Sequence, residues 1–288
     1  MPNAIYLQIY SKVFSFYKHA KKDLLMTFDE NQIERYARHL ILDEIGGKGQ
    51  NKLLNSKVLV VGAGGLGSPI LLYLAAAGVG TLGIIDDDRV ALSNLQRQII
   101  HDENSISDYK TKSAVGRIEK LNPDVKLIPY TIRLTAKNIE EIFNDYDIIA
   151  DGSDNFDTRF LINDACYLMK KILVSGAILR FDGQLSTFKA FQGTSNPCYR
   201  CIHPEPPPPN IIPSCAEGGV LGAIAGTIGS LQAVEIIKEL LEIGNGLSGR
   251  LLIYDALSTM FRAVKVKPDP SCKLCSKNSV IKNLSLHI

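Results

Sequence analysis

The chain has 288 residues, of which 45% are hydrophobic and 22% are charged, and its formal net charge at pH 7 is +2. These proportions are typical of a soluble globular protein with a sizeable core. The nearly balanced charge gives no argument for a nucleic-acid partner or a membrane surface. The longest run of apolar and small residues, 220–234, is shorter than the ~20 residues that a bilayer requires, so we predict no membrane partner.

Residues 1–27 do not fit the pattern of the rest of the chain. Their apolar segments precede the lysines, which is the wrong order for a secretory signal, and no cleavage site of small residues is visible. The first arginine is Arg35, which argues against an organellar transit peptide. We expect residues 1–27 to form an extension outside the fold, and residues 28–288 to form a single domain.

Two short helices are predicted before the first strand. Apolar residues recur at spacings of three and four from Asp29 onward, and Gly46 and Gly47 end this pattern. A second helix is expected over 48–54. Arg38 lies on the first helix, where an arginine considered by itself would be a solvated charge.

The segment 57–68 organises the remainder of the chain. Its apolar residues 58–61 predict a strand buried on both faces, and residues 69–77 predict the helix that follows. Between them is a G-x-G-x-x-G turn, whose backbone can approach a phosphate at the positive end of that helix. A second apolar strand ends at Asp86, 19 residues after the last glycine, where such folds place an acid that binds ribose hydroxyls. This order predicts nucleotide binding, and the glycines of the turn are Gly62, Gly64 and Gly67.

Strands and helices continue to alternate up to residue 176. This alternation predicts a mostly parallel, Rossmann-like sheet with helices on both faces. A polar loop follows the second strand, where sheets of this kind bind ligands. The expected helices are 110–121, 138–143 and 156–169, and the expected strands are 125–130, 147–151 and 172–176.

The pattern then changes to antiparallel structure. Residues 184–191 alternate between apolar and polar, as an antiparallel strand would. Six prolines in 204–213 predict an extended connector. A long helix rich in small residues is expected over 218–243, and closing strands are expected at 250–254 and 261–266.

Four of the six cysteines form two Cys-x-x-Cys pairs, and Cys272 follows Cys201 by 71 residues. Two such pairs can complete a closed tetrahedral site around Zn²⁺, which has a structural role because it leaves no position for water. Redox couples or an iron–sulfur cluster are the alternatives. Metal rather than disulfides indicates a reducing compartment, so we predict a cytoplasmic protein. The expected zinc ligands are Cys198, Cys201, Cys272 and Cys275.

The two remaining cysteines differ in their surroundings. Cys166 lies within a predicted helix and is expected in the core. Cys215 follows the proline-rich connector just before the long helix, and a thiol near a helix N-terminus has a stabilised thiolate. The sequence leaves open whether Cys215 has a chemical function or is a bystander in a loop.

Several separate motifs together resemble one family. The chain is similar to the ThiF/MoeB/HesA proteins, relatives of the ubiquitin-activating enzymes, and most similar to their molybdopterin-synthase adenylyltransferase branch. The resemblance covers residues 28–276. Many members of this branch continue into a rhodanese domain, which we do not expect here. The motifs are RYARH at 35–39, GAGGLG at 62–67, LSNLQRQ at 92–98, DGSDN at 151–155, GQ at 183–184, PCYRC at 197–201 and GSLQA at 229–233.

The resemblance implies a reaction. ATP and Mg²⁺ bind, and the C-terminal Gly-Gly carboxylate of a ubiquitin-like sulfur carrier attacks the α-phosphate. The products are a carrier acyl-adenylate and pyrophosphate, and a separate persulfide donor then supplies sulfur for a thiocarboxylate. The pathway left open is molybdopterin, thiamin, cysteine or tRNA thiolation.

The resemblance also assigns roles around the phosphates. Arg97 and Lys110 match the phosphate-binding arginine and lysine, and Lys112 remains an alternative because it lies on the same helical turn. Asn94 would donate to the phosphates, and Asp86 would hold the ribose. Cations in these places would stabilise the charge that develops when two anions react.

Three further residues take roles from the family. Asp154 matches a Mg²⁺-binding aspartate, and a carboxylate with phosphate oxygens is what Mg²⁺ prefers. Arg38 matches an arginine that reaches across a two-fold interface, which implies a homodimer with composite sites. Cys215 matches a sulfur-transfer or thioester cysteine that some relatives do not need. The nucleotide loop of the family corresponds to Gly62, Gly64, Gly65 and Gly67.

Two other classes of function compete with this reading. An NAD-dependent oxidoreductase would explain the glycine turn and Asp86, but not the cations or the cysteine quartet. A non-catalytic nucleotide-binding scaffold that docks a ubiquitin-like partner is the other alternative. Carrier-dependent exchange of pyrophosphate into ATP distinguishes the adenylating enzyme from both.

Overall fold

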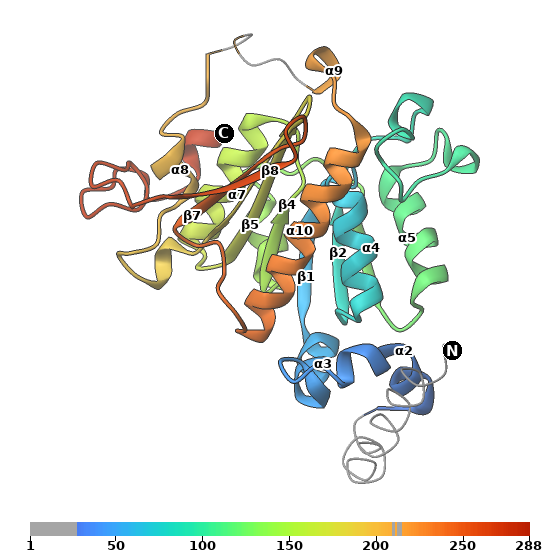
Figure 1. Cartoon of the computed structure of the whole chain (residues 1–288). Helices are drawn as coiled ribbons and strands as arrows, with labels where there is room; N and C mark the ends of the chain where they lie inside the picture. The colour runs from blue at the N-terminus through green and yellow to red at the C-terminus, as the bar shows by residue number, and fades with distance from the viewer. Residues whose placement is uncertain (1–27, 209–210, 212–214) are drawn as a thin grey trace.

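The computed structural model describes residues 28–208, 211 and 215–288; the extension predicted at 1–27 lies outside them. Within the described residues, eight strands form one sheet in the order β3-β2-β1-β4-β5-β6-β7-β8 (Figure 1). The first five of these are mutually parallel, and the last three are antiparallel to their neighbours. The strands are β1 (Lys57–Val61), β2 (Thr81–Ile85), β3 (Lys126–Tyr130), β4 (Ile148–Asp151), β5 (Ile172–Leu179), β6 (Asp182–Phe188), β7 (Arg250–Asp255) and β8 (Met260–Lys265).

Helices cover both faces of the parallel part, as the alternating pattern predicts. Strand β1 serves both faces, because Val58 and Val60 belong to one apolar cluster and Leu59 and Val61 to the other. One face is covered by α4 (Gly67–Ala77), α5 (Lys110–Leu121) and α10 (Gly222–Leu241). The other is covered by α6 (Ile139–Asn144) and α7 (Phe156–Leu168). The predicted α/β class and the parallel sheet with an antiparallel continuation are therefore confirmed.

The first two helices lie at the end of the sheet where β1 begins (Figure 1). They are α2 (Glu30–Leu40) and α3 (Gly46–Asn55). Asp29 caps α2 by accepting from the Gln32 backbone N–H at 2.8 Å. The apolar side of α2 includes Tyr36, whose hydroxyl accepts from Asn122 at 2.9 Å. Everything carried by α2 is therefore at the opposite end of the sheet from the glycine turn.

The long helix is shorter than predicted at both ends. The observed helix, α10, runs from Gly222 to Leu241 rather than over 218–243. The backbone is left-handed beyond each end, with a φ of +76° at Gly219 and +59° at Glu242. The segment before α10 pairs instead with the β5–β6 turn, where the Arg180 backbone N–H donates to the Gly219 carbonyl at 2.9 Å. This non-local pairing, which helical periodicity does not encode, delays the start of the helix to Gly222.

The antiparallel strands also differ from the predicted boundaries. The expected strand 184–191 is β6, Asp182–Phe188, and residues 190–192 form a 3₁₀ turn. Strand β5 extends to Leu179 because every residue of β6 pairs with it, from Phe188 opposite Leu173 to Asp182 opposite Leu179. No helix among the described residues combines the length and apolarity that crossing a bilayer demands.

Candidate nucleotide and zinc sites

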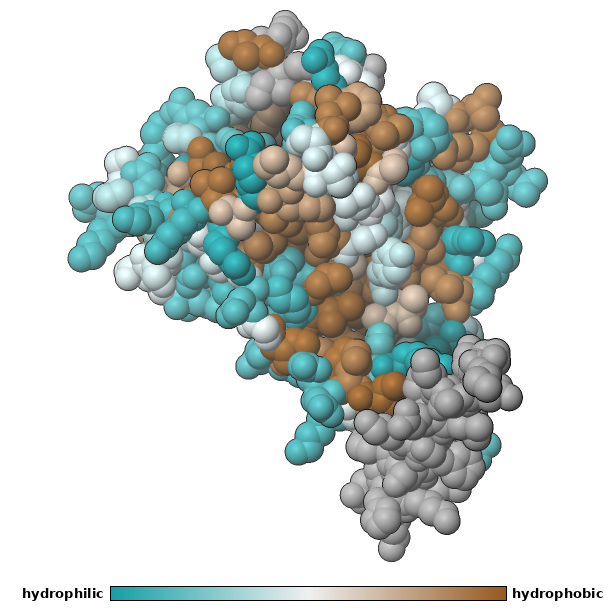
Figure 2. Space-filling model, viewed as in Figure 1, coloured by the Kyte–Doolittle hydropathy of each residue, from teal (hydrophilic) through white to brown (hydrophobic). Residues whose placement is uncertain are grey.

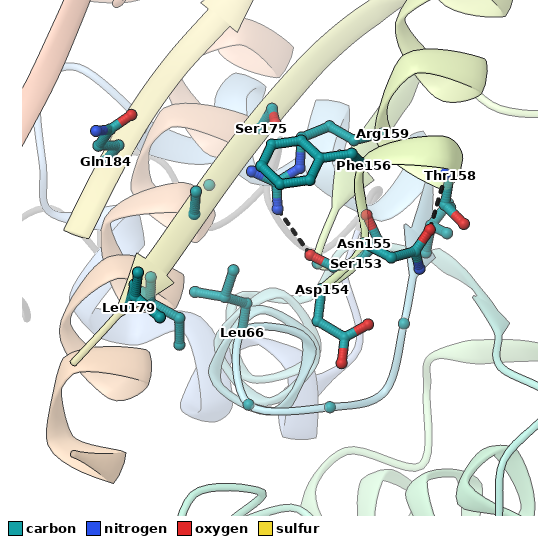
Figure 3. Close-up of a pocket in the computed structure, with 18 of the residues that line it drawn as sticks. Leu66, Ser153, Asp154, Asn155, Phe156, Thr158, Arg159, Ser175, Leu179 and Gln184 are labelled. Atoms are coloured by element: carbon teal, nitrogen blue, oxygen red, sulfur yellow. Dashed lines mark hydrogen bonds between the residues drawn. The ribbon is translucent and has the colours of Figure 1, made fainter. Parts of the chain in front are cut away.

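A cavity of about 680 Å³ opens at the carboxyl ends of the parallel strands (Figure 3). Turns that follow β1, β2 and β4 supply much of its wall, as expected for a doubly wound sheet. Most of the predicted nucleotide residues meet here although they are distant in sequence. The predicted residues that line the cavity are Gly62, Gly64, Gly65, Asp86, Arg97, Lys110 and Asp154.

The glycine turn cannot hold side chains at two of its positions. Gly62 has a φ of +92°, and a Cβ there would lie 2.9 Å from the Gly152 carbonyl oxygen. A Cβ on Gly67 would lie 1.8 Å from the Gly62 carbonyl oxygen. Gly67 lies behind the cavity and lets α4 start close against the turn, whereas Gly64 and Gly65 face the cavity.

Asp86 holds the turn in place as well as facing the cavity. One carboxylate oxygen accepts from the Ala63 backbone N–H at 2.8 Å, and the other accepts from the Asp88 N–H at 2.9 Å. Burial raises the pKa of Asp86 above its ordinary value, although Lys110 and these N–H groups oppose the rise. The predicted contact with ribose stays a prediction.

The two candidate lysines on the first turn of α5 occupy different surroundings. Lys110 lines the cavity, its side chain is 8% exposed, and its ammonium lies 2.8 Å from the Asp88 carboxylate. Lys112 is exposed, pairs with Asp108 at 3.1 Å and does not line the cavity. The geometry therefore favours Lys110 as the phosphate ligand. Arg97 also lines the cavity and anchors its guanidinium on the Ser93 carbonyl at 3.1 Å.

Two predicted residues do not reach this cavity. The side-chain oxygen of Asn94 accepts from the Ala91 N–H at 3.1 Å, and Asn94 does not line the cavity. Arg38 is exposed on α2 at the far end of the sheet (Figure 1). Within one subunit, Arg38 and the glycine turn are kept apart by the length of β1.

The turn after β4 presents Asp154 to the cavity (Figure 3). Asp151, at the end of β4, is fully buried and accepts from the hydroxyls of Ser153 and Ser175 at 2.6 and 2.7 Å. Asn155 caps α7 by accepting from the Thr158 N–H at 2.9 Å. Asp154, between these two fixed residues, is left exposed. Its carboxylate is therefore available to a cation.

Two polar residues of the cavity wall were missed by the sequence analysis. Arg159 donates to the Ser153 carbonyl at 2.8 Å (Figure 3). It also lies 3.5 Å from the Asp151 carboxylate. Gln98 is 4% exposed, and its side-chain oxygen has no hydrogen-bond partner among the described residues. Only the neighbourhood of known motifs could have pointed to either, because an isolated Arg or Gln carries no periodic signal.

The four cysteines of the two Cys-x-x-Cys pairs come together as predicted, with their sulfur atoms within 4.8 Å of one another. The Sγ–Sγ distances are 3.9 Å for Cys198–Cys201, 3.5 Å for Cys198–Cys272 and 3.4 Å for Cys201–Cys275. A tetrahedral zinc with Zn–S bonds of ~2.3 Å places its sulfurs about 3.8 Å apart. The Cys275 backbone N–H also lies 3.5 Å from the Cys272 sulfur, as suits a thiolate. The donor set fits structural zinc.

A buried ion pair supports the first cysteine pair. Arg200 donates from two nitrogens to both oxygens of Asp164, each at 2.7 Å. His287 lies 2.8 Å from the same carboxylate, which joins the C-terminal segment to α7. The neighbouring Tyr199 packs edge-on against Phe160, and its ring lines the cavity. The zinc region is thus connected to the cavity wall through one short helix, α8 (Tyr199–Ile202).

The two remaining cysteines, Cys166 and Cys215, lie in different parts of the fold. Cys166 is buried in the core as expected, and burial raises the pKa of its thiol well above the ordinary value. Cys215 begins the four-residue helix α9 (Cys215–Gly218) rather than standing directly before the long helix, which starts at Gly222. The side chain of Cys215 lies outside the described part of the chain.

The sequence is similar to those of several known proteins that are named adenylyltransferases. An adenylyltransferase and sulfurtransferase MOCS3 of Aedes aegypti is 48% identical over 268 residues, which are 93% of this chain and 61% of that protein. This chain therefore spans less than two thirds of that relative. A sulfur carrier protein adenylyltransferase of Thermus thermophilus is 47% identical over 252 residues, 87% of this chain and 93% of that protein.

A solved structure shares the fold. Escherichia coli MccB crystallised with ATP superposes with a TM-score of 0.70 over 90% of this chain and 79% of that chain, at 18% identity. The ThiF family profile matches residues 36–274, which is most of the sequence. With the glycine turn, the cysteine quartet and these relatives in agreement, the chain belongs to the ThiF family.

Proposed function

We propose that this chain is an adenylyltransferase that activates the C-terminal glycine carboxylate of a ubiquitin-like sulfur-carrier protein with ATP. The observation that carries the proposal is one cavity that combines the glycine turn with Arg97, Lys110 and Asp154. The 47% identity to a protein named sulfur carrier protein adenylyltransferase supports the choice of acceptor.

The residues of the cavity suit an in-line displacement at phosphorus. A carboxylate oxygen of the carrier forms a bond to the α-phosphorus, the bond to the bridging oxygen breaks, and pyrophosphate leaves with that electron pair. Arg97 and Lys110 would neutralise the charge shared by the two anions. Asp154 would hold Mg²⁺, which supplies further positive charge to the phosphate oxygens.

The cysteine quartet contributes to the fold rather than to the reaction. We assign structural Zn²⁺ to Cys198, Cys201, Cys272 and Cys275, because four thiolates close the coordination sphere. The adenylylation step needs no protein nucleophile, since the carrier carboxylate attacks. Any role of Cys215 belongs to the later sulfur transfer, in which a separate persulfide donor delivers sulfur for molybdopterin or thiamin synthesis.

We propose a homodimer in which Arg38 serves the cavity of the partner subunit. Arg38 is exposed on α2 and far from its own cavity, so a second copy is required for it to act there. Figure 2 shows apolar side chains gathered over the middle of one face, around α10. An apolar surface of this kind is typical of a protein interface. Exposed apolar residues of this region include Leu221 and Val234.

The deciding experiment is exchange of labelled pyrophosphate into ATP with and without candidate Gly-Gly-ended carriers. We expect exchange that requires both the carrier and Mg²⁺. Asp154→Ala should abolish it, while Asp157→Ala, one turn away on α7 and outside the cavity, should retain it. Full exchange by the Asp154→Ala variant would remove the metal assignment, and no exchange by the wild type with any carrier would overturn the proposed function.

A further inference from the structure

We infer that His101 is a positioning residue that fixes the glycine turn in its nucleotide-binding conformation and ties it to α5. This inference rests on the proposed use of ATP, but it concerns a residue outside the cavity wall. His101 lies behind the turn, 7% exposed, between the first strand–helix connection and the helix that carries Lys110.

Both ring nitrogens of His101 have partners. Nε2 lies 2.9 Å from the carbonyl oxygen of Ala63, and Nδ1 lies 2.8 Å from the hydroxyl of Ser113 on α5. A carbonyl oxygen only accepts, so Nε2 carries the proton and donates to Ala63. Nδ1 of the neutral ring then accepts from the Ser113 hydroxyl.

The neutral ring is the form that this environment favours. Burial lowers the pKa of His101 below its ordinary value, and the positive charge of Lys110 acts in the same direction. The Ala63 carbonyl and the carboxylate of Asp102 oppose the shift. The Ala63 carbonyl therefore selects the tautomer, which presents its only N–H to the glycine turn, and the Ser113 hydroxyl donates to Nδ1.

Ala63 is held from both sides. Its N–H donates to Asp86 at 2.8 Å, and its carbonyl accepts from His101. A trans peptide unit is planar, and its C=O and N–H point in opposite directions. Because the Ala63 carbonyl is turned toward His101, the N–H of Gly64 in the same peptide unit is turned away from it. Gly64 lines the cavity, and its N–H donates to no acceptor among the described residues.

A fixed peptide plane presents that N–H to a phosphate without reorganisation when the ligand arrives. If His101 did not hold the carbonyl, the Ala63–Gly64 peptide could rotate, since glycine tolerates both orientations. The same contact links the turn to Ser113 and so to α5, on which Lys110 stands. His101 would therefore hold the glycine turn and Lys110 in a fixed position relative to each other.

The test compares two amides at position 101. Gln places its side-chain nitrogen as many bonds from Cα as Nε2 of histidine, so His101→Gln can donate to Ala63. Asn places its nitrogen as far out as Nδ1, so His101→Asn cannot reach. We expect His101→Asn to weaken ATP binding by about tenfold, the loss of one hydrogen bond, and His101→Gln to stay within about threefold of the wild type. Affinity is measured by calorimetry on the full chain, with thermal unfolding recorded for each variant.

Equal ATP affinity in folded His101→Asn and wild-type protein would overturn the inference. Nitrogen NMR of the wild type gives a second measurement that needs no variant: we expect the Nε2–H tautomer, and the Nδ1–H tautomer would also overturn it. The carrier takes no part in either measurement. A wild type that binds ATP but exchanges no pyrophosphate would therefore remove the proposed function and leave this inference standing.

Discussion

Lys110 and Asp88 contact each other through both side chain and backbone. The lysine ammonium lies 2.8 Å from the Asp88 carboxylate, and the lysine N–H donates to the Asp88 carbonyl at 3.0 Å. The carboxylate is 69% exposed whereas the lysine side chain is nearly buried. Asp88 thus holds the ammonium at the cavity wall from a largely solvent-exposed position.

This arrangement predicts that the two lysines on the first turn of α5, Lys110 and Lys112, are not equivalent. We expect Lys110→Met to lower carrier-dependent pyrophosphate exchange by about 100-fold or more, because a preorganised positive charge is lost next to the reacting anions. Lys112→Met, on the same turn but outside the cavity, should stay within about twofold of the wild type. Initial exchange rates at saturating carrier measure both, and a similar loss in the two variants would contradict the assignment of Lys110.

Removal of one zinc ligand should destabilise the fold. We expect the wild type to contain one zinc per chain by plasma mass spectrometry, and Cys272→Ser to contain almost none. The melting temperature of that variant should fall by roughly 5 to 10 °C, since metal binding and folding are coupled. Cys166→Ala is the matched control, because Cys166 is buried away from the quartet. A Cys272→Ser protein that keeps its zinc would argue against the four-thiolate site.

The buried carboxylate of Asp164 should make stability depend on pH. Burial raises the pKa of Asp164, but hydrogen bonds from His287 and Arg200 more than offset this effect, so the pKa lies below its ordinary value. The stabilisation is therefore present above the unfolded-state pKa, near 4, and is lost as the pH falls through the lower folded-state value.

Asp164→Asn should accordingly lower the free energy of unfolding at pH 7 by about 3 kcal/mol, since it leaves Arg200 buried without its anion. Urea unfolding from pH 7 down to pH 3 measures the difference between variant and wild type, which should narrow below about pH 4. His287→Gln keeps the Arg200–Asp164 pair and should cost less. A variant whose deficit is constant across this range would show that Asp164 does not titrate as proposed.

Subunit mixing tests the proposed role of Arg38. We expect Arg38→Ala and Lys110→Ala each to be nearly inactive alone. If Arg38 acts in the partner's cavity, a mixed dimer has one cavity with both substitutions and one with neither. Equal amounts of the two variants, exchanged to equilibrium, should then recover about a quarter of the wild-type sites. Mixtures that stay inactive despite forming mixed dimers would contradict a composite site.

The parts of the fold predicted correctly from the sequence are those encoded locally. Residues 58–61 are buried on both faces as their apolar run predicts, and the glycine turn has the backbone that its spacing requires. The cysteine quartet was predictable because each Cys-x-x-Cys pair fixes its own geometry. The start of α10 was missed because the pairing of Gly219 with Arg180 joins residues 39 positions apart.

The cavity was predictable only in part, for a similar reason. The choice between Lys110 and Lys112 depends on which side of one helical turn faces the glycine loop, and the sequence favoured Lys110 but left Lys112 as an alternative. The role inferred for His101 depends on contacts made by the folded chain, so nothing local identifies it. Family resemblance supplied Arg38 and Asn94, whose side chains lie outside the cavity of this single subunit.

The separation of the two cysteine pairs has a consequence for biosynthesis. Cys272 follows Cys201 by 71 residues, and α10, β7 and β8 lie between them. At ribosomal rates of about 5 to 20 residues per second, the first dithiol waits about 4 to 14 seconds for the second. During that interval it is a bare vicinal dithiol open to oxidation, so newly made chains should be more sensitive to oxidants and to zinc shortage than finished ones.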